Sequence, residues 1–409
     1  MADTPSREYL KSHGIDGTGT LQFGIEIEFC IPPTEYPITQ EHPACVNADL
    51  AHLDMAKALQ AEGLNTAVEL ESLSFPGCEG RNPVVECAAY EGLREDFKVM
   101  DTRSMAGRAQ AVFPYRHWVV KGEDDLDTPE GRLLNWIPTE LNTPILTQQE
   151  AELGLKNVNI ALTAIHHQCL GQIHIGEKNY GLHVHVSPTA GLTLRQAQRI
   201  VTLTWLLEPD LLFSLCPEAR QEVNPPLAKN ARFIVEAPQH PADPAKSYPE
   251  MREDVPIPLI RAQRKALTRI YDAVNLVELS EIVKGRNLAH PSMDECFENL
   301  GLVIRHHCSD HNKETVTVEF RHAQSSFSQK FIREWVALVL NITKVALLTP
   351  TEYKKMLLRI WELVSEPEAQ GGWVCLFTMI KRRLQFEWDV DMDERFWLQR
   401  TRESSTFQQ

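Results

Sequence analysis

Three short segments of the sequence each place two charged or metal-ligating side chains two residues apart. They are Glu26 and Glu28 in FGIEIEF (23–29), His183 and His185 in GLHVHVSP (181–188), and Glu319 and Arg321 in TVEFRHAQSS (317–326). Side chains two apart on a β-strand share a face and lie roughly 6.5 Å apart. The residue between each pair is apolar, so we expect each pair to project from one strand face while the other face packs into a core.

The residue types in these pairs favour a metal ion that carries phosphate. Two buried carboxylates such as Glu26 and Glu28 repel each other unless a cation lies between them. Carboxylate oxygens suit Mg²⁺ or Mn²⁺, and a histidine ligand favours a site that tolerates Mn²⁺. An arginine beside a ligating glutamate, as in Glu319 and Arg321, binds phosphate oxygens well. Each pair alone is more typical of a solvated strand face or an ion pair, and only the three together predict a site.

Hydrophobic spacing indicates the elements that would position these residues. Alternation predicts strands at 21–31 and 314–323 and a strand or hairpin at 171–188, with shorter extended pieces at 117–122 and 133–146. Helical spacing covers 48–62, 147–167, 193–215, 259–284, 328–348, 351–365 and 373–386. Thr147 with Glu150 and Thr193 with Gln196 have the spacing of capping boxes. Interleaved strands and helices with a helical end indicate an α+β fold with a mainly antiparallel sheet.

Two polar segments do not fit these periodicities. Residues 217–258 are rich in proline and charge, and we expect a long loop or insertion there, either passive or a lid over a substrate. Residues 304–314 (IRHHCSDHNKE) contain three histidines and a cysteine, but their spacing matches no common zinc site. We interpret this segment as a polar loop that enters the following strand.

Composition restricts the classes of partner. The formal net charge of −15 disfavours nucleic acid and membrane surfaces, and it requires a local cation if the substrate is a polyanion such as ATP. The nine cysteines are scattered without a CxxC pair, and the first residues are polar. We therefore expect a cytoplasmic protein with reduced thiols.

The three motifs, in this order, resemble the signature segments of the amidoligase family, within the carboxylate–amine ligase superfamily that includes glutamine synthetase and glutamate–cysteine ligase. Three further segments resemble the family between and after these motifs: HWVVKGEDDL (117–126), TELNTPIL (139–146) and FIREWVALVLNI (331–342). The resemblance covers roughly residues 20–348. Either Asp124 or Asp125 matches the acidic turn of the family, and the sequence leaves that choice open.

The resemblance implies a glutamine-synthetase-type catalytic domain, in which a curved, mainly antiparallel sheet with flanking helices holds ATP and metal ions. It implies that Glu26, Glu28, Glu140, His183 and Glu319 bind two or more Mg²⁺ or Mn²⁺ ions. His183, His185 and Arg321 would contact ATP, with the choice between the two histidines as metal ligand left open. Arg321, Glu319 and His185 would be the catalytic residues, and Arg321 would hold the transferring phosphoryl group.

The implied activity is ATP-dependent formation of an amide or isopeptide bond through an acyl phosphate. Its partners would be an amine and a carboxylate of a small molecule, a peptide or a protein side chain. Alternatives are an inactive protein that binds ATP and metal, a cupin-like metalloenzyme with an HxH motif, and a kinase of guanidino groups. We expect a flexible segment at 1–20, a catalytic domain at 21–348 that includes the 217–258 insertion, and a helical extension at 349–409 packed on the same domain.

Overall fold

A computed structural model of the chain describes twelve stretches of sequence. They are residues 20–33, 44–69, 98–100, 116–123, 126, 134–176, 179–235, 248–285, 300–307, 315–365, 372–384 and 392–406. The predicted flexible segment at 1–20 lies outside the described residues except for Thr20, and so do Asp124 and Asp125.

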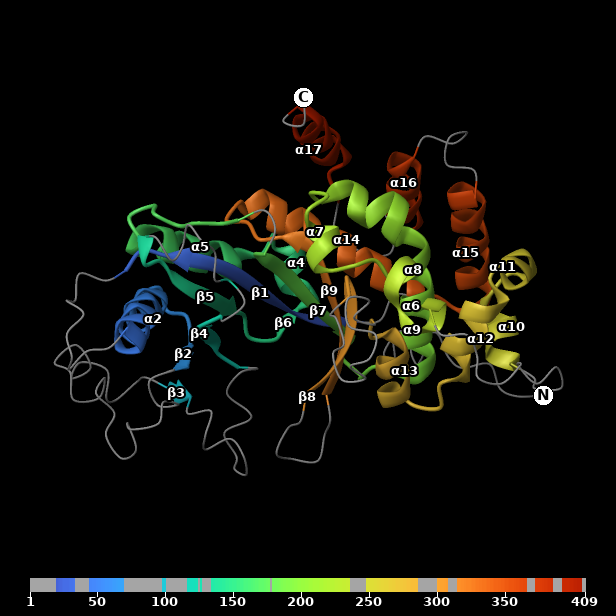
Figure 1. The fold of residues 1–409 in the computed structure, drawn as a ribbon, viewed down its shortest axis with the longest axis horizontal. Helices are drawn as coiled ribbons and strands as arrows, with labels where there is room; N and C mark the ends of the chain where they lie inside the picture. The colour runs from blue at the N-terminus through green and yellow to red at the C-terminus, as the bar shows by residue number, and fades with distance from the viewer. Residues whose placement is uncertain are drawn as a thin grey trace.

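The described strands form one mainly antiparallel sheet (Figure 1). They are β1 (Leu21–Ile31), β2 (Thr66–Glu69), β3 (Lys98–Met100), β4 (Trp118–Lys121), β5 (Ile137–Asn142), β6 (Leu146–Thr147), β7 (Gly181–Pro188), β8 (Leu302–His307) and β9 (Thr315–Gln324). Their order is β3-β2-β4-β5-β1-β7-β9-β8, and β6 pairs with β1. Only the pairings of β2 with β3 and with β4 are parallel among these strands. The predicted α+β class with a mainly antiparallel sheet is therefore confirmed.

One face of this sheet is the core face. Three helices cover it: α2 (Ala44–Ala61), α5 (Lys156–Gln168) and α14 (Gln329–Ala346). Helix α5 lies between the other two and contacts both. Along β1, Ile25, Ile27 and Phe29 are buried in the main hydrophobic cluster, as the alternation predicts. Gly63 has a φ of +78°, which suits its predicted position after the end of α2. The opposite face carries Glu26 and Glu28.

A helical layer extends from the β8 side of the sheet (Figure 1). It contains α6 (Leu194–Leu207), α11 (Ile257–Ala262), α12 (Arg264–Asp272), α13 (Leu276–Val283), α15 (Pro350–Ser365), α16 (Trp373–Leu384) and α17 (Glu394–Thr406). The Thr193–Gln196 capping box is present at the start of α6. The helical path continues to Leu215 through a π-helical turn at Glu208–Leu212 and a 3-10 turn. Trp397 of α17 is buried with its ring against Phe331 and Trp335 of α14.

The predicted helix at 147–167 is divided in two at Gly154 and Leu155, whose φ angles of +75° and +61° interrupt the helical path, and Glu150 does not form a capping box with Thr147. Thr147 makes no side-chain cap, and α4 (Gln148–Glu152) ends before α5 begins. The Glu150 carboxylate instead accepts hydrogen bonds from the backbone N–H of Asn157 at 2.6 Å and from its side chain at 3.0 Å. It thereby satisfies an N–H group in the first turn of α5, which would otherwise have no partner.

The proline-rich stretch is not a long loop over its described part. It forms α7 (Arg220–Val223), α8 (Leu227–Asn230), α9 (Arg232–Val235) and α10 (Pro249–Asp254), while 236–247 lie outside the described residues. Pro249 occupies the first turn of α10, where its missing N–H costs nothing. The buried Asp254 then anchors α10, because Arg195 and Arg199 of α6 approach its Oδ1 to 2.7 and 2.5 Å.

The interpretation of 304–314 as a polar loop was wrong for its first part. Residues 304–307 belong to β8, which pairs with β9 along its length, and 308–314 lie outside the described residues. In the described part of the 171–188 segment the strand is β7, and His174 makes an isolated β-bridge with Cys30. Among the described helices, none is both long and apolar enough to cross a membrane.

Candidate functional site

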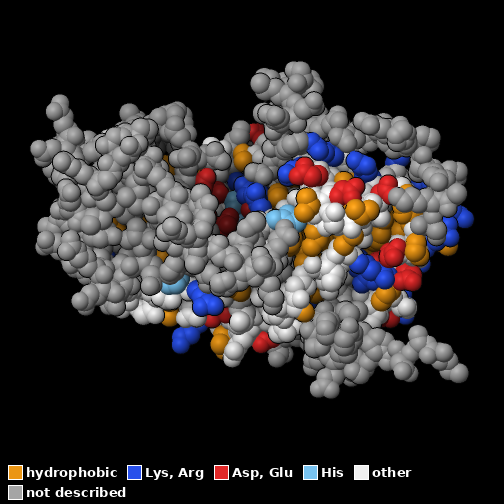
Figure 2. Space-filling view, turned by 90° about the horizontal axis from the view of Figure 1, so that it is seen from below, with side chains coloured by type: hydrophobic (Ala, Val, Ile, Leu, Met, Phe, Trp, Pro, Cys, Tyr) orange, Lys and Arg blue, Asp and Glu red, His pale blue; other side chains and the backbone are white. Residues whose placement is uncertain are grey.

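The three predicted pairs meet on one face of the sheet, because β1, β7 and β9 are neighbours. Glu26 on β1 lies opposite His183 on β7, and His185 lies opposite Glu319 on β9. Figure 2 shows acidic and basic side chains gathered in a hollow of the molecular surface, beside atoms that are not described. We call the set of Glu26, Glu28, His183, His185, Glu319 and Arg321 the central cluster.

Glu26 is the carboxylate that joins the two histidines. Its Oε2 lies 3.2 Å from Nδ1 of His183, and its Oε1 lies 3.0 Å from Nε2 of His185. Burial acts to raise the pKa of Glu26, but the two histidines outweigh it and hold the pKa well below its usual value. Burial acts to lower the pKa of His185, and Glu26 and Glu319 outweigh it in turn and raise that pKa. Glu26 and His185 therefore attract each other strongly.

Glu319 is the most heavily shared carboxylate of the cluster. Its side chain is 1% exposed, and Nη1 of Arg321 approaches its Oε1 to 2.6 Å. Arg305 on β8 donates its Nε–H to the other oxygen, Oε2. Burial acts to raise the pKa of Glu319, but His185, Arg321 and His183 lower it to about 2. Glu319 is thus held as an anion by cations from three strands.

Three members of the cluster fit the ligand shell of one divalent ion. A ligand atom from each of Glu26, His185 and Glu319 lies within 4.8 Å of the other two. Oxygen ligands lie roughly 2.1 Å from Mg²⁺, so two ligands of one ion can be at most about 4.2 Å apart. The distances from Nε2 of His185 to Oε1 of Glu26 and to Oε1 of Glu319, 3.0 and 3.9 Å, satisfy this limit, while the carboxylates of Glu26 and Glu319 lie within 4.8 Å of each other. Two carboxylates and an imidazole suit Mn²⁺ and accommodate Mg²⁺.

Glu28 lies farther along β1 and is oriented by the backbone of β7. Its Oε2 accepts a hydrogen bond from the N–H of Gly181 at 2.5 Å, and its Oε1 lies 3.5 Å from Nε2 of His183. A β-carbon at position 181 would lie 2.2 Å from Nε2 of His183 and 3.0 Å from Oε2 of Glu28. Only glycine allows His183 and Glu28 to approach each other in this way.

Glu140 lies on the same face but outside the three-ligand group. It is opposite Glu28 in the pairing of β1 with β5, and Nζ of Lys121 approaches its Oε2 to 3.2 Å. Burial and the charge of Glu26 raise the pKa of Glu140 well above its usual value, although Lys121 opposes this. The assignment of Glu140 as a metal ligand stays a prediction, as do the roles of the other predicted ligands.

Arg321 is held by the proline-rich stretch. Asn224, just after α7, accepts from Nε of Arg321 through Oδ1 at 3.3 Å and donates through Nδ2 to the backbone carbonyl of Arg321 at 3.2 Å. Arg220 of α7 donates to the same carbonyl at 3.0 Å. Burial lowers the pKa of Arg220 to about 10, and the positive charge of Arg321 acts in the same direction. The negative charge of Glu28 opposes this shift. The stretch therefore positions the predicted phosphate-binding arginine.

Several of these contacts were not predicted from the sequence. They involve Arg305, Gly181, Asn224, Thr317 and Lys121, of which Thr317 lies 3.2 Å from Nδ1 of His185 through its hydroxyl. The signal for Arg305 was weak, since the arginine of LVIRHH (302–307) belongs to none of the three paired motifs. Gly181 lies two residues before His183 on the same strand face, and its role could have been suspected from that spacing.

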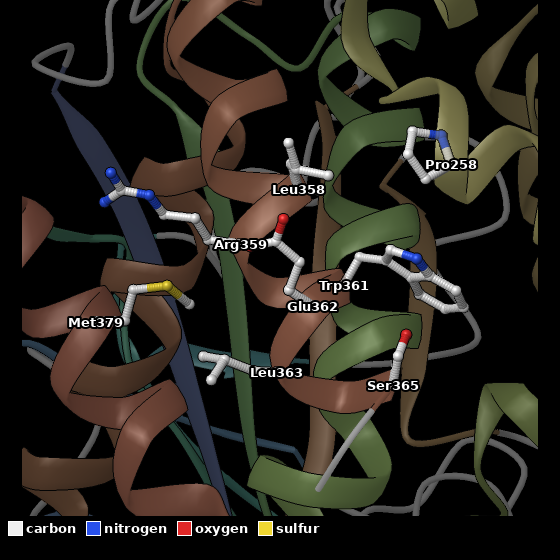
Figure 3. Close-up of a pocket in the computed structure, with 8 residues that line it drawn as sticks. All are labelled: Pro258, Leu358, Arg359, Trp361, Glu362, Leu363, Ser365 and Met379. Carbon is white, nitrogen blue, oxygen red and sulfur yellow. The ribbon is translucent and has the colours of Figure 1, made fainter. Parts of the chain in front are cut away.

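A groove of about 550 Å³ lies elsewhere, on the helical layer. Figure 3 shows Met379 and Leu363 on one side of α15, and Trp361 and Pro258 on the other. Its lining contains one carboxylate, Glu362, and no histidine, so it lacks the ligand set of a metal site.

The arrangement of the central cluster can bind a divalent ion beside a fixed guanidinium group. Those two charges can neutralise a phosphate group, and the neighbouring carboxylates can hold a second ion. Comparison of the chain with protein-family models, curated proteins and solved structures finds no match.

Proposed function

We propose that this protein is an ATP- and Mg²⁺-dependent ligase that joins a carboxylate to an amine through an acyl phosphate. The supporting observation is that Glu319 is shared between Arg321 and the group formed by Glu26 and His185. A metal site without phosphate would not need an arginine on a ligating carboxylate. The mainly antiparallel sheet with its charged face is compatible with a glutamine-synthetase-type domain, which is the fold that we propose.

Two covalent steps make up the reaction. A carboxylate oxygen of the first substrate attacks the γ-phosphorus of ATP, a new O–P bond forms, and the bond to the bridging oxygen breaks so that ADP leaves. The amine nitrogen then attacks the carbonyl carbon of the acyl phosphate, inorganic phosphate leaves, and the nitrogen loses a proton. The product is an amide or isopeptide bond. The carboxylate belongs to a small molecule, a peptide or a protein side chain.

The residues of the central cluster would bind and orient the reacting groups. Arg321, held by Asn224, would bind the oxygens of the transferring phosphoryl group. Glu26, His185 and Glu319 would hold one divalent ion, and Glu28, Glu140 and His183 are the side chains available for a second. When bound, these ions neutralise the charge of the phosphate oxygens.

The experiment measures ADP formation with Mg²⁺ or Mn²⁺, a panel of carboxylates, and hydroxylamine as the amine, which traps an acyl phosphate as a hydroxamate. We expect ADP and hydroxamate in equal amounts. Replacement Glu319→Ala should lower the rate by about 10³-fold or more, because it removes a metal ligand and the partner of Arg321. Glu152→Ala, at an exposed glutamate of α4, is the matched control and should retain full activity.

Other outcomes point to the alternative functions. A folded Glu319→Ala protein with full activity contradicts the proposal. Binding of ATP without ADP formation across the whole panel supports an inactive binding protein. Metal binding without affinity for ATP supports a metalloenzyme of the cupin type, and a phosphorylated guanidino product supports a kinase.

A further inference from the structure

Two arginines bind Glu319, and they differ in how firmly the protein holds them. Arg321 contacts Oε1 and Arg305 contacts Oε2, so both oxygens of this carboxylate carry a guanidinium group. The side chain of Arg321 is 16% exposed, whereas that of Arg305 is 37% exposed. The buried carboxylate of Glu319 therefore has one largely buried partner, Arg321, and one more exposed partner, Arg305.

Arg321 has fixed contacts besides Glu319. Its Nε donates to Asn224, and its Nη1 lies 3.3 Å from Nδ1 of His183. Its backbone carbonyl is held by Arg220 and Asn224, both of which are 1% exposed. These contacts keep Arg321 in place whatever binds to Glu319.

Arg305 lies on β8, the last strand of the described sheet, opposite Thr317 of β9. Its side chain reaches Glu319 from this strand at the end of the sheet, with more than a third of its surface exposed. Partly exposed side chains change rotamers more readily than buried ones. Arg305 is therefore held less firmly at Glu319 than Arg321 is.

A divalent ion in the group formed by Glu26, His185 and Glu319 would act against Arg305 through its charge. The ion would use Oε1 of Glu319, which Arg321 also contacts, while Arg305 contacts Oε2 of the same carboxylate. The ion would repel both guanidinium groups, and Arg305 is the one that is held less firmly. A triphosphate chain bound to that ion would bring anionic oxygens close to Arg305 at the same time. Guanidinium groups bind such oxygens in a bidentate manner.

We propose that Arg305 is a second anion-binding residue, which holds Glu319 in the absence of metal and transfers to the phosphate oxygens of the nucleotide when an ion binds Glu319. This inference rests on the proposed function, since it assumes the ion and the nucleotide. It predicts that ion and nucleotide bind cooperatively, because the ion alone must displace Arg305 and the nucleotide gives Arg305 a new partner.

The test is the binding of Mn²⁺, measured from the electron paramagnetic resonance signal of the free ion, with and without a non-hydrolysable ATP analogue. In Arg305→Ala we expect Mn²⁺ alone to bind roughly 3- to 10-fold more tightly, because the competing cation is gone. We expect the analogue to bind roughly 10-fold or more weakly in the presence of Mn²⁺, because a charge-assisted contact is lost. The cooperativity between the two ligands should shrink accordingly.

Two further variants sharpen the test. Arg305→Lys keeps the competing charge, so Mn²⁺ alone should bind as in the wild type, while the analogue binds more weakly without the bidentate contact. Arg333→Ala is the matched control, because Arg333 on α14 is also a partly exposed arginine (43%) that binds a buried glutamate, Glu334, at 3.2 Å. It should change neither affinity.

The outcomes separate this inference from the proposed function. A wild-type protein that binds no Mn²⁺ overturns both. A wild-type protein that binds Mn²⁺ and the analogue, with unchanged affinities in Arg305→Ala, overturns only the inference. Tighter Mn²⁺ binding with unchanged affinity for the analogue also overturns it, because Arg305 would then block the ion without binding the nucleotide.

Discussion

Buried histidines on the two faces of the central sheet have pKa values that are shifted in opposite directions. On the core face, His52 of α2 is fully buried against Thr139 of β5, and burial lowers its pKa to about 4. On the other face, burial also opposes the charge of His185, but Glu26 and Glu319 outweigh burial and raise its pKa. The difference shows that depth does not decide the charge of a histidine here. The nearby carboxylates do.

The pKa values of buried carboxylates on the two faces are also shifted in opposite directions. Behind β9, Glu208 lies in the core and has fixed partners, with His322 at 2.9 Å and the backbone N–H of Leu227 at 2.6 Å. In front of β9, Glu319 lies among His185, Arg321 and His183, which lower its pKa to about 2 although burial and Glu26 oppose them. Burial therefore dominates at Glu208, whose pKa it raises, whereas the surrounding cations dominate at Glu319.

The largest effect that would test this comparison is on stability. Glu208→Ala should lower the free energy of unfolding by about 3–5 kcal/mol, because His322 and the Leu227 N–H lose their buried partner. Glu319→Ala should lower it by a similar amount at pH 7, because the cations around Glu319 lose the anion that they stabilise, and this loss should fade as the pH drops from 4.5 to about 2. Urea titrations of both variants at neutral and acidic pH measure the difference. A loss in Glu319→Ala that does not change with pH would remove the distinction between the faces.

The next effect is on pH dependence and concerns His52. Its pKa is lower in the folded state, about 4, than the ordinary value of 6.5, so the unfolded chain takes up this proton first. The free energy of unfolding should therefore fall by on the order of 3 kcal/mol as the pH drops from 6.5 to 4, and no further contribution from this group follows below that. His52→Gln should lose this part of the slope in urea titrations across the range. An unchanged slope would mean that His52 is protonated in the fold.

The smallest of the three effects concerns the glycines of the site face. Gly181→Ala should weaken Mn²⁺ binding by about 10- to 100-fold, because the new methyl group displaces His183 and Glu28. Gly24→Ala is the matched control on the neighbouring strand, since its β-carbon would meet His185 and Thr143 only at 4.0 Å. It should bind Mn²⁺ as the wild type does. A similar loss in both variants would indicate a general disturbance of the sheet.

Periodicity predicted the elements of the site better than their surroundings. The alternation in β1 and β9 is strong because one face of each strand is buried in the core, so the positions of Glu26, Glu28, Glu319 and Arg321 followed directly. The 217–258 stretch was misjudged because its helices are too short to show a period. Its prolines also suggested a loop, although Pro249 begins a helix.

The sequence patterns did not predict contacts between elements that are distant along the chain. Nothing in the local sequence indicates that Asp254 meets Arg199, or that Glu150 caps the following helix and not its own. Arg305 was missed for the same reason, since it reaches Glu319 only when β8 pairs with β9. The family resemblance predicted that the three pairs lie on one face of a sheet. The adjacent positions of β1, β7 and β9 place them there.

The antiparallel pairing of distant strands also has a consequence for folding. His183 lies 157 residues from Glu26 and His185 lies 132 residues from Thr317 along the chain. Such pairs form only after large loops have closed, and folds dominated by them acquire their structure slowly. The ligands of the proposed ion are consequently dispersed in every partly folded chain. An ion that binds here selects the completed sheet, and at about 100 times its dissociation constant it would add roughly 2.7 kcal/mol to the stability of that state alone.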